Sequence, residues 1–203
     1  MKRNSRFSKF WSKIKSKRRR KKLVFKQLGS YDETFKVMLL GEPGAGRSTL
    51  AQKYCFDFFN PELGVSVGVD FYVKSLDFQG RKIKLQIWDI GGEERFNFLL
   101  PTYCIGASAV MIIYDITDPQ SLKQLYNWVQ IIRGKIRDVP IMLVGNKLDL
   151  EKNRKLEKEE AMEIVKKYKL ASYSEISIKT GQNVEKSFET LTEMLIGSSL
   201  PQL

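Results

Sequence analysis

The feature that most constrains how this chain can fold is a glycine-rich stretch, GEPGAGRS, at residues 41–48. It follows an apolar run with strand character, residues 35–40, and precedes a segment that can be helical, residues 48–55. Glycines let such a backbone curl so that its N–H groups point at a phosphate, with the positive end of the next helix behind them. The spacing is that of a P-loop, G-x-x-x-x-G-K-[ST], except that Arg47 stands at the lysine position. A turn that merely joins strand to helix is the alternative, and the remaining motifs decide between the two.

Charge is distributed unevenly along the chain. Residues 1–28 carry 13 Lys and Arg and no acidic residue. The remaining 175 residues carry 22 Lys and Arg against 23 Asp and Glu, so the formal net charge of +12 belongs to the N-terminal segment. The basic composition is therefore no evidence that the protein as a whole binds nucleic acid.

Composition also excludes several kinds of site. The sequence has no histidine, which excludes general-base catalysis and metal ligation by that side chain. Its two cysteines, Cys55 and Cys104, fit no metal-ligand spacing, and we expect free thiols in a reducing compartment. No apolar run approaches the ~20 residues that span a bilayer. These features predict a cytoplasmic protein.

The N-terminal segment has the pattern of a basic amphipathic helix followed by a basic run at residues 17–22. In a helix, four apolar side chains would share one face: Phe7, Phe10, Trp11 and Ile14. Such a face suits an anionic membrane surface, where each basic residue adds ~1 kcal/mol. Nucleic-acid binding, a nuclear-import patch and a solvated disordered tail are the alternatives. We favour the membrane, which would place the protein peripherally on its cytoplasmic face.

From Thr34 onward, apolar strand-like runs alternate with helical patterns, which predicts an α/β domain. Alternating apolar residues at 69–73 and 83–87, on either side of Gln79-Gly80, predict a hairpin of two half-buried strands. Continuous apolar runs at 109–114 and 141–145 predict strands buried on both faces. We expect an N-terminal extension and linker over residues 1–33, a domain over 34–197 and a short tail over 198–203.

Asp118 and Pro119 predict the start of a helix, with aspartate as the N-cap and proline at the first helical position. The inner stripe of that helix would consist of Leu122, Leu125, Val129 and Ile132. These residues are expected to form core only.

The motif WDIGG at residues 88–92 ends the second strand of the predicted hairpin. An aspartate at this place, Asp89, can hold Mg²⁺, usually through water. Gly92 can donate its backbone N–H to a terminal phosphate while the following loop moves. The motif is weak by itself, because Asp-x-x-Gly is common.

Two motifs with a possible role in base recognition follow, NKLD at residues 146–149 and SIK at 177–179. The carboxylate of Asp149 can accept two N–H donors from guanine, whereas adenine presents neither in that arrangement. A turn that only closes a strand is the alternative for NKLD alone. The SIK segment could give a backbone N–H to the base oxygen. Because the carboxyl ends of parallel strands meet at one edge, all four motifs are expected to form one site there.

On these motifs, and over residues 34–196, the chain resembles a small GTPase of the Ras superfamily and, within it, the Rab-like branch. The Rab-like stretches are VGVDF at 67–71, KLQIW at 84–88, RF at 95–96 and YDIT at 114–117. The resemblance implies a three-layer P-loop NTPase G domain. Its six-stranded sheet would be mostly parallel, with one antiparallel edge strand and helices on both faces.

The resemblance also implies roles for matching residues. Guanine nucleotide, GTP or GDP, would be bound by Gly41, Glu42, Pro43, Gly44, Ala45, Gly46, Arg47, Ser48, Thr49, Phe59, Ser66, Gly92, Asn146, Lys147, Asp149, Ser177, Ile178 and Lys179. Mg²⁺ would be bound by Ser48, Ser66 and Asp89, and hydrolysis would involve Arg47, Glu93 and Ser66. Effectors would meet the aromatic trio Phe71, Trp88 and Tyr103, for which ordinary hairpin packing is the alternative.

Four positions depart from the family pattern. Arg47 keeps the charge of the lysine, but its guanidinium is a broad planar fork. Glu93 replaces the glutamine that orients the attacking water, and a carboxylate cannot donate to the transferring phosphoryl group. Pro43 removes an N–H donor near the γ-phosphate, and Ser66 replaces a threonine. We expect weaker nucleotide binding or slow hydrolysis, with hydrolysis affected more.

The favoured hypothesis is a monomeric nucleotide-dependent switch with effector, exchange-factor and GTPase-activating partners, in vesicle trafficking by resemblance. Binding of GTP and Mg²⁺ would order residues 59–71 and 91–103, and hydrolysis would release them. A GTPase-shaped scaffold that holds nucleotide permanently, or none, is the second hypothesis. An ATPase is a distant third.

Overall fold

A computed structural model describes residues 30–59, 68–92, 98–136 and 138–199 of the 203-residue chain. Within these ranges, six strands form one sheet in the order β2-β3-β1-β4-β5-β6. The strands are β1 (Glu33–Leu40), β2 (Val69–Phe78), β3 (Arg81–Ile90), β4 (Ala109–Asp115), β5 (Ile141–Asn146) and β6 (Ser172–Glu175). All neighbours are parallel except the edge strand β2, which pairs antiparallel with β3. The predicted sheet is confirmed.

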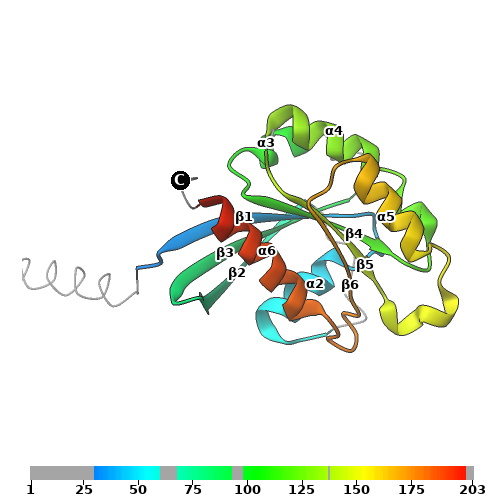
Figure 1. The fold of residues 1–203 in the computed structure, drawn as a ribbon, viewed down its shortest axis with the longest axis horizontal. Helices are drawn as coiled ribbons and strands as arrows, with labels where there is room; N and C mark the ends of the chain where they lie inside the picture. The colour runs from blue at the N-terminus through cyan, green and yellow to red at the C-terminus, as the bar shows by residue number, and fades with distance from the viewer. Residues whose placement is uncertain (1–29, 60–67, 93–97, 137, 200–203) are drawn as a thin grey trace, which may run out of the picture.

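Helices cover both faces of this sheet (Figure 1). They are α2 (Arg47–Phe56), α3 (Leu100–Cys104), α4 (Leu125–Lys135), α5 (Lys158–Lys167) and α6 (Val184–Ser199), with 3₁₀ turns η2 (Pro119–Leu122) and η3 (Leu148–Asn153). Helices α2 and α6 pack on one face, where the rings of Tyr54 and Phe188 stack at 3.7 Å. Helices α3, α4 and α5 pack on the other. The predicted three-layer architecture is confirmed.

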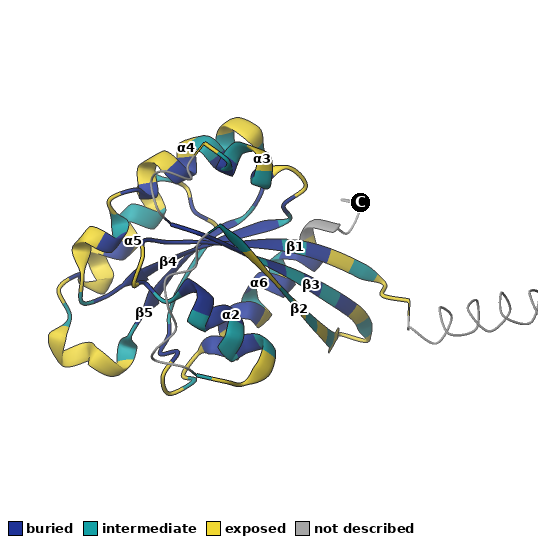
Figure 2. Ribbon diagram, turned by 180° about the vertical axis from the view of Figure 1, so that it is seen from behind, coloured by how far each residue is buried: buried dark blue, intermediate teal, exposed yellow. Residues whose placement is uncertain are grey.

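The central strand β1 belongs to both cores. Val37 and Leu39 face α2 and α6, whereas Met38 and Leu40 face the opposite helix layer. Figure 2 shows the central strands largely in the colour of buried residues. A strand covered on both sides needs apolar side chains at successive positions, which explains the unbroken apolar run before the glycine-rich loop.

The hairpin forms as predicted around Gln79-Gly80, but its two apolar triplets lie on opposite faces. In an antiparallel pair, directly opposed residues share a face, and Phe71 pairs with Trp88 while Tyr72 pairs with Ile87. The side chains that β2 turns toward the α2–α6 core are therefore Tyr72, Leu76 and Phe78. Phe71 and Val73 remain 63% and 51% exposed.

The segment after β4 starts as predicted but is not one helix. Asp118 accepts a hydrogen bond from the backbone N–H of Gln120 at 3.1 Å, and Pro119 follows it. The first turn is 3₁₀, with the N–H of Lys123 bonded to the carbonyl of Gln120, and α4 begins only at Leu125. Leu122 still packs against the core beside α4.

Candidate nucleotide-binding site

The strand register brings the four motifs to one edge of the sheet. Leu39 pairs with Asp89, so the loop after β1 lies beside the WDIGG motif. The pairing of β4 with β5 and of β5 with β6 brings the NKLD and SIK segments to the same edge. The predicted convergence therefore follows from the parallel arrangement of four strands.

The glycine-rich loop runs directly into helix α2. Gly44 and Gly46 have φ of 88° and 101°, in the left-handed region that glycine adopts without strain. A side chain at Gly46 would not fit, because its Cβ would lie 2.5 Å from Nδ2 of Asn146. The first N–H groups of α2 follow at once, so the loop meets the positive end of the helix. This is the backbone arrangement that an anion-binding loop requires.

The first two residues of α2 contact the WDIGG motif. The hydroxyl of Ser48 donates to Oδ2 of Asp89. Arg47 places Nε 3.8 Å from Oδ1 of Asp89, and its Nη1 donates to the carbonyl of Ile90 at 2.5 Å. Arg47 is 4% exposed and Asp89 is fully buried. Burial lowers the pKa of Arg47, while the negative charges of Asp89 and Glu42 raise it.

The oxygen donors of this cluster suit Mg²⁺ in kind. Mg²⁺ prefers oxygen ligands and is commonly held by one or two protein groups together with substrate phosphates and water. Ser48 and Asp89 offer a hydroxyl and a carboxylate, and Ser66 lies outside the described residues. The described part of the chain contains no group of three or more His, Cys, Asp or Glu arranged to hold a metal. The donors therefore fit Mg²⁺ bound partly through phosphate, with Arg47 already beside the carboxylate.

Gly92 sits directly against the glycine-rich loop. A Cβ added there would lie 2.0 Å from the carbonyl oxygen of Gly41 and 2.6 Å from Nη1 of Arg47. The amide of Gln124 donates to the carbonyl of Gly92 at 3.3 Å. Only glycine fits this position beside the glycine-rich loop.

Asn146 ties three loops together. Its Nδ2 donates to the carbonyl of Ala45 at 2.9 Å, and its Oδ1 accepts from the backbone N–H of Ile178 at 3.3 Å. The side chain is 4% exposed. Asn146 therefore fixes the glycine-rich loop to the SIK segment, a role that the motif alone did not reveal.

Asp149 lies beside the SIK segment, as predicted. Its Oδ1 accepts from the hydroxyl of Ser177 at 2.6 Å, and its Oδ2 lies 3.9 Å from Nζ of Lys179. Lys147 has φ of 71°, and its Nζ pairs with Oδ2 of Asp115 at 2.5 Å. Asp115 was not among the predicted site residues, although it stands in the YDIT stretch.

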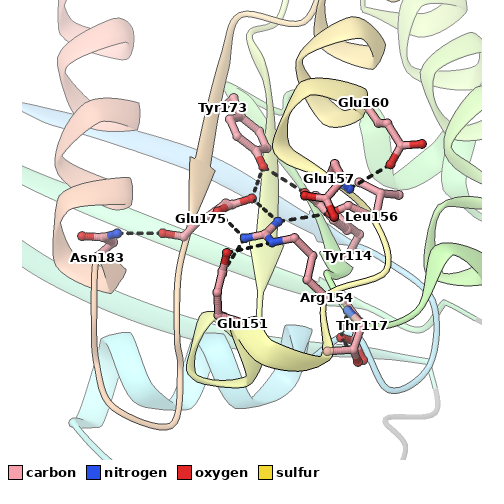
Figure 3. Close-up of polar contacts among 11 residues, drawn as sticks. Tyr114, Thr117, Glu151, Arg154, Leu156, Glu157, Glu160, Tyr173, Glu175 and Asn183 are labelled. Atoms are coloured by element: carbon pink, nitrogen blue, oxygen red, sulfur yellow. Dashed lines mark hydrogen bonds and ion pairs between the residues drawn. The ribbon is translucent and has the colours of Figure 1, made fainter.

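Arg154 is a further residue that the motifs did not indicate (Figure 3). Its Nη1 and Nη2 donate to the two carboxylate oxygens of Glu175, each at 2.8 Å, and its Nη2 and Nε donate to Glu151 at 2.7 and 3.0 Å. The hydroxyl of Tyr173 also donates to Glu175, at 2.5 Å. Burial raises the pKa of Glu175, but hydrogen bonds from Arg154 and Tyr173 lower it below its usual value. The arginine thus joins η3, which contains the last two residues of NKLD, to β6, which precedes SIK.

Comparison with known proteins agrees with this geometry. A family model described as the Ras family matches residues 36–196. The chain is 35% identical over 168 residues to the Ras-related protein Rab-13 of Canis lupus familiaris, covering 82% of each protein. It is 36% identical over 167 residues to the Ras-related protein SEC4 of Candida albicans, covering 82% of this chain and 79% of the relative.

The chain belongs to the Ras family. Within the Ras superfamily it is a Rab-like small GTPase, which confirms the resemblance inferred from the motifs.

The aromatic trio of this Ras-family domain comes together across β2, β3 and α3. Phe71 meets Trp88 edge-on at 4.6 Å between ring centroids, and Trp88 lies 6.2 Å from Tyr103. Nζ of Lys36 stands 3.7 Å from the centroid of Trp88. The role of the aromatic trio as an effector surface stays a prediction.

The other predicted residues have the following places. Phe59 is half-buried and packs against the core beneath α2 and α6, and Thr49 lies half-buried in the first turn of α2. Pro43 is exposed at the tip of the glycine-rich loop. The residues that lie outside the described ranges are Phe7, Phe10, Trp11, Ile14, Ser66 and Glu93.

Proposed function

We propose that this Ras-family domain binds GTP and GDP at the edge of the sheet and alternates between two states as a molecular switch. The observation that carries the proposal is the double hydrogen bond of Asn146, which joins the glycine-rich loop to the SIK segment. A phosphate site and a base site are thereby held at a fixed separation. A nucleotide, which has both a phosphate group and a base, is the kind of ligand that would occupy both sites.

Each end of that ligand has its own partners in the proposal. The N–H groups of residues 44–47 would hold the β-phosphate, and the carboxylate of Asp149 would accept the two N–H groups of guanine. Ser48 and Asp89 would hold Mg²⁺, which supplies positive charge to the phosphates when bound. Guanine rather than adenine follows from Asp149, because a carboxylate only accepts hydrogen bonds.

Hydrolysis is expected to be slow. Phosphoryl transfer depends on positioning and on positive charge at the transferring group. The Nη1 of Arg47 is instead bonded to the carbonyl of Ile90, and Pro43 offers no N–H at the loop tip. Glu93 brings a negative charge where the family has a neutral amide. A GTPase-activating partner that supplies an arginine would then control the lifetime of the GTP state.

Gly92 is placed to transmit the state of the site. It contacts the glycine-rich loop and begins the loop that leads to Tyr103 and the aromatic trio. A change at the γ-phosphate would therefore displace the start of this loop and alter the surface offered to an effector. Exchange factors would act on the same loops.

A second candidate function is a scaffold that presents the aromatic trio without a nucleotide cycle. The contacts of Arg47 with Asp89 and Ile90 favour it, because they link the glycine-rich loop to the WDIGG motif through the protein's own side chains. Such links hold the loops in place without any ligand.

Two measurements on the purified full chain test the switch. We expect close to stoichiometric guanine nucleotide after purification, not displaced by excess ATP, and slow phosphate release in a single turnover. Stimulation of that release by a partner would support the switch further. Absence of bound nucleotide, together with no rise in melting temperature on adding GTP, would refute the switch and support the scaffold function.

A membrane role is proposed for the basic extension at residues 1–28. Its 13 basic residues would contact anionic lipid, and the four apolar side chains on one face of its predicted helix would enter the headgroup boundary. Among the described residues, no helix has the length and apolar character needed to cross a bilayer. Attachment through the extension would keep the switch peripheral to the membrane.

A further inference from the structure

The side chain of Arg47 crosses from helix α2 to the end of β3, where one guanidinium nitrogen makes a hydrogen bond and another makes a longer ion-pair contact. Nη1 donates to the carbonyl of Ile90, and Nε lies 3.8 Å from Oδ1 of Asp89. Nη1 also fills the space beside Gly92, where a methyl group would come within 2.6 Å of it. The guanidinium is therefore seated in a close-fitting buried site between two of the nucleotide-site motifs.

This placement puts a permanent positive charge beside Asp89, the carboxylate that would hold Mg²⁺. Asp89 is fully buried, and the hydroxyl of Ser48 donates to its other oxygen. A buried carboxylate is stabilised by such a cation and donor, and needs a metal correspondingly less. A dication brought to the same carboxylate would be repelled by the guanidinium and would compete with it.

Lysine could not make the same set of contacts. Its ammonium is a single compact charge on a flexible stem, whereas the planar fork of arginine directs several N–H groups at fixed angles. One end of the fork can pair with Asp89 while the other bonds to the carbonyl of Ile90. The two contacts together depend on arginine.

We propose that Arg47 acts as a built-in cation beside the Mg²⁺ donors Ser48 and Asp89, so that this chain binds guanine nucleotide largely independently of Mg²⁺. This inference rests on the proposed function, because it concerns the same nucleotide site. In a small GTPase of this kind, Mg²⁺ would supply positive charge at the nucleotide site. For GDP binding in this chain, the guanidinium of Arg47 supplies that charge instead. Arg47 is accordingly a positioning and charge-supplying residue, and Asp89 is its anchor.

The test is the dissociation constant of a fluorescent GDP analogue for the full chain, measured in millimolar MgCl₂ and in EDTA. For the wild type we expect removal of Mg²⁺ to weaken binding by less than about threefold. In Arg47→Lys, the carboxylate of Asp89 loses its fixed partner. Removal of Mg²⁺ should then weaken GDP binding by roughly 30- to 150-fold, the upper part of the usual range of coupling between two ligands. Arg81→Lys, a replacement in an ion pair with Glu33 far from the site, should behave as the wild type does.

The melting temperature of the wild type provides a measurement that does not depend on the variant folding. The rise caused by saturating GDP should be the same in MgCl₂ and in EDTA to within about 2 °C, since ligand stabilisation follows affinity. Equal loss of affinity in EDTA by the wild type and by Arg47→Lys would overturn the inference and leave the proposed function intact. Failure of the wild type to bind GDP in either buffer would overturn both.

Discussion

Gly92, Asn146 and Arg47 show how single residues define this site. Each is placed by a contact with a segment far away in the sequence: Gly92 with Gly41, Asn146 with Ala45, and Arg47 with Ile90. The family motifs name all three residues. The motifs do not indicate that each of these residues also links the loops of the site to one another.

Replacement of Gly92 by alanine is expected to destabilise the fold. The new Cβ would lie 2.0 Å from the carbonyl oxygen of Gly41, so the glycine-rich loop or the start of the next loop must move. Overpacking of this kind costs about 1–3 kcal/mol, measurable as a lower urea midpoint. Gly134→Ala in α4, where a Cβ meets nothing within 4 Å, is the control and should be neutral or slightly stabilising. Equal stability of the two variants would contradict close packing of Gly92 against the carbonyl of Gly41.

Asp149 is expected to decide the choice of base. In Asp149→Asn, the side chain keeps its shape but loses the charge that accepts two donors from guanine. Hydrogen bonds to a charged group contribute about 1.5–3 kcal/mol each, so GDP affinity should fall by at least tenfold. Titration with a fluorescent GDP analogue measures this affinity. Asp138→Asn, at an exposed position, is the control and should leave the affinity unchanged. Unchanged affinity would remove Asp149 from the base site.

At the scale of elements, the NKLD and SIK segments are held by a polar network that the motifs do not indicate. Arg154 bridges η3 and β6, and Tyr114 of β4 joins through the hydroxyl of Tyr173 at 3.0 Å. The network fixes NKLD relative to SIK. A mobile pair of loops would have to be ordered by the nucleotide at a cost in affinity.

This network makes a prediction about pH. Hydrogen bonds from Arg154 and Tyr173 hold the pKa of Glu175 below its unfolded value. The carboxylate therefore stabilises the fold above about pH 4.5, and this contribution is lost as the pH falls through the folded-state pKa. Glu175→Gln should be less stable than the wild type at pH 7, with a difference that shrinks toward pH 3.5.

Urea unfolding at the two pH values measures this difference. Glu159→Gln, on the exposed face of α5, is the matched control and is expected to change stability little at either pH. A stability difference for Glu175→Gln that is as large at pH 3.5 as at pH 7 would contradict the ionised role of Glu175.

At the scale of the molecule, the neutral domain and the basic extension are expected to act separately. The family match begins at residue 36, and the 13 basic residues of the extension precede it. The domain carries the nucleotide chemistry, and the extension would choose the surface on which it operates.

Deletion of residues 1–28 is therefore expected to abolish co-sedimentation with anionic liposomes and to leave GDP affinity and melting temperature unchanged. Because electrostatic attraction to lipid is screened by salt, pelleting of the full chain should also fall as ionic strength rises. Neutral liposomes are the control. Equal pelleting of the full and shortened chains would refute the membrane role, and binding of RNA or DNA in its place would favour the nucleic-acid alternative.

The sequence predicted the sheet, its strand types and the meeting of four motifs, because these depend on local pattern. Unbroken apolar runs specify strands buried on both faces, and parallel strands end at a common edge. The alternation in the hairpin was equally clear, yet it could not tell which face of β2 is buried. Register with β3 decided that, and it turned Phe71 outward beside Trp88.

What the sequence determined by itself was the order of elements and the family, and it supplied the residues predicted for the site. What only the tertiary structure decided was how those residues use their polar groups. Arg47 could have pointed along the loop or beneath it, and its seat between Asp89 and Ile90 exists only because β3 lies beside β1. The physical reason is that a buried charge must find its partners across the fold, and such partners have no fixed distance in sequence.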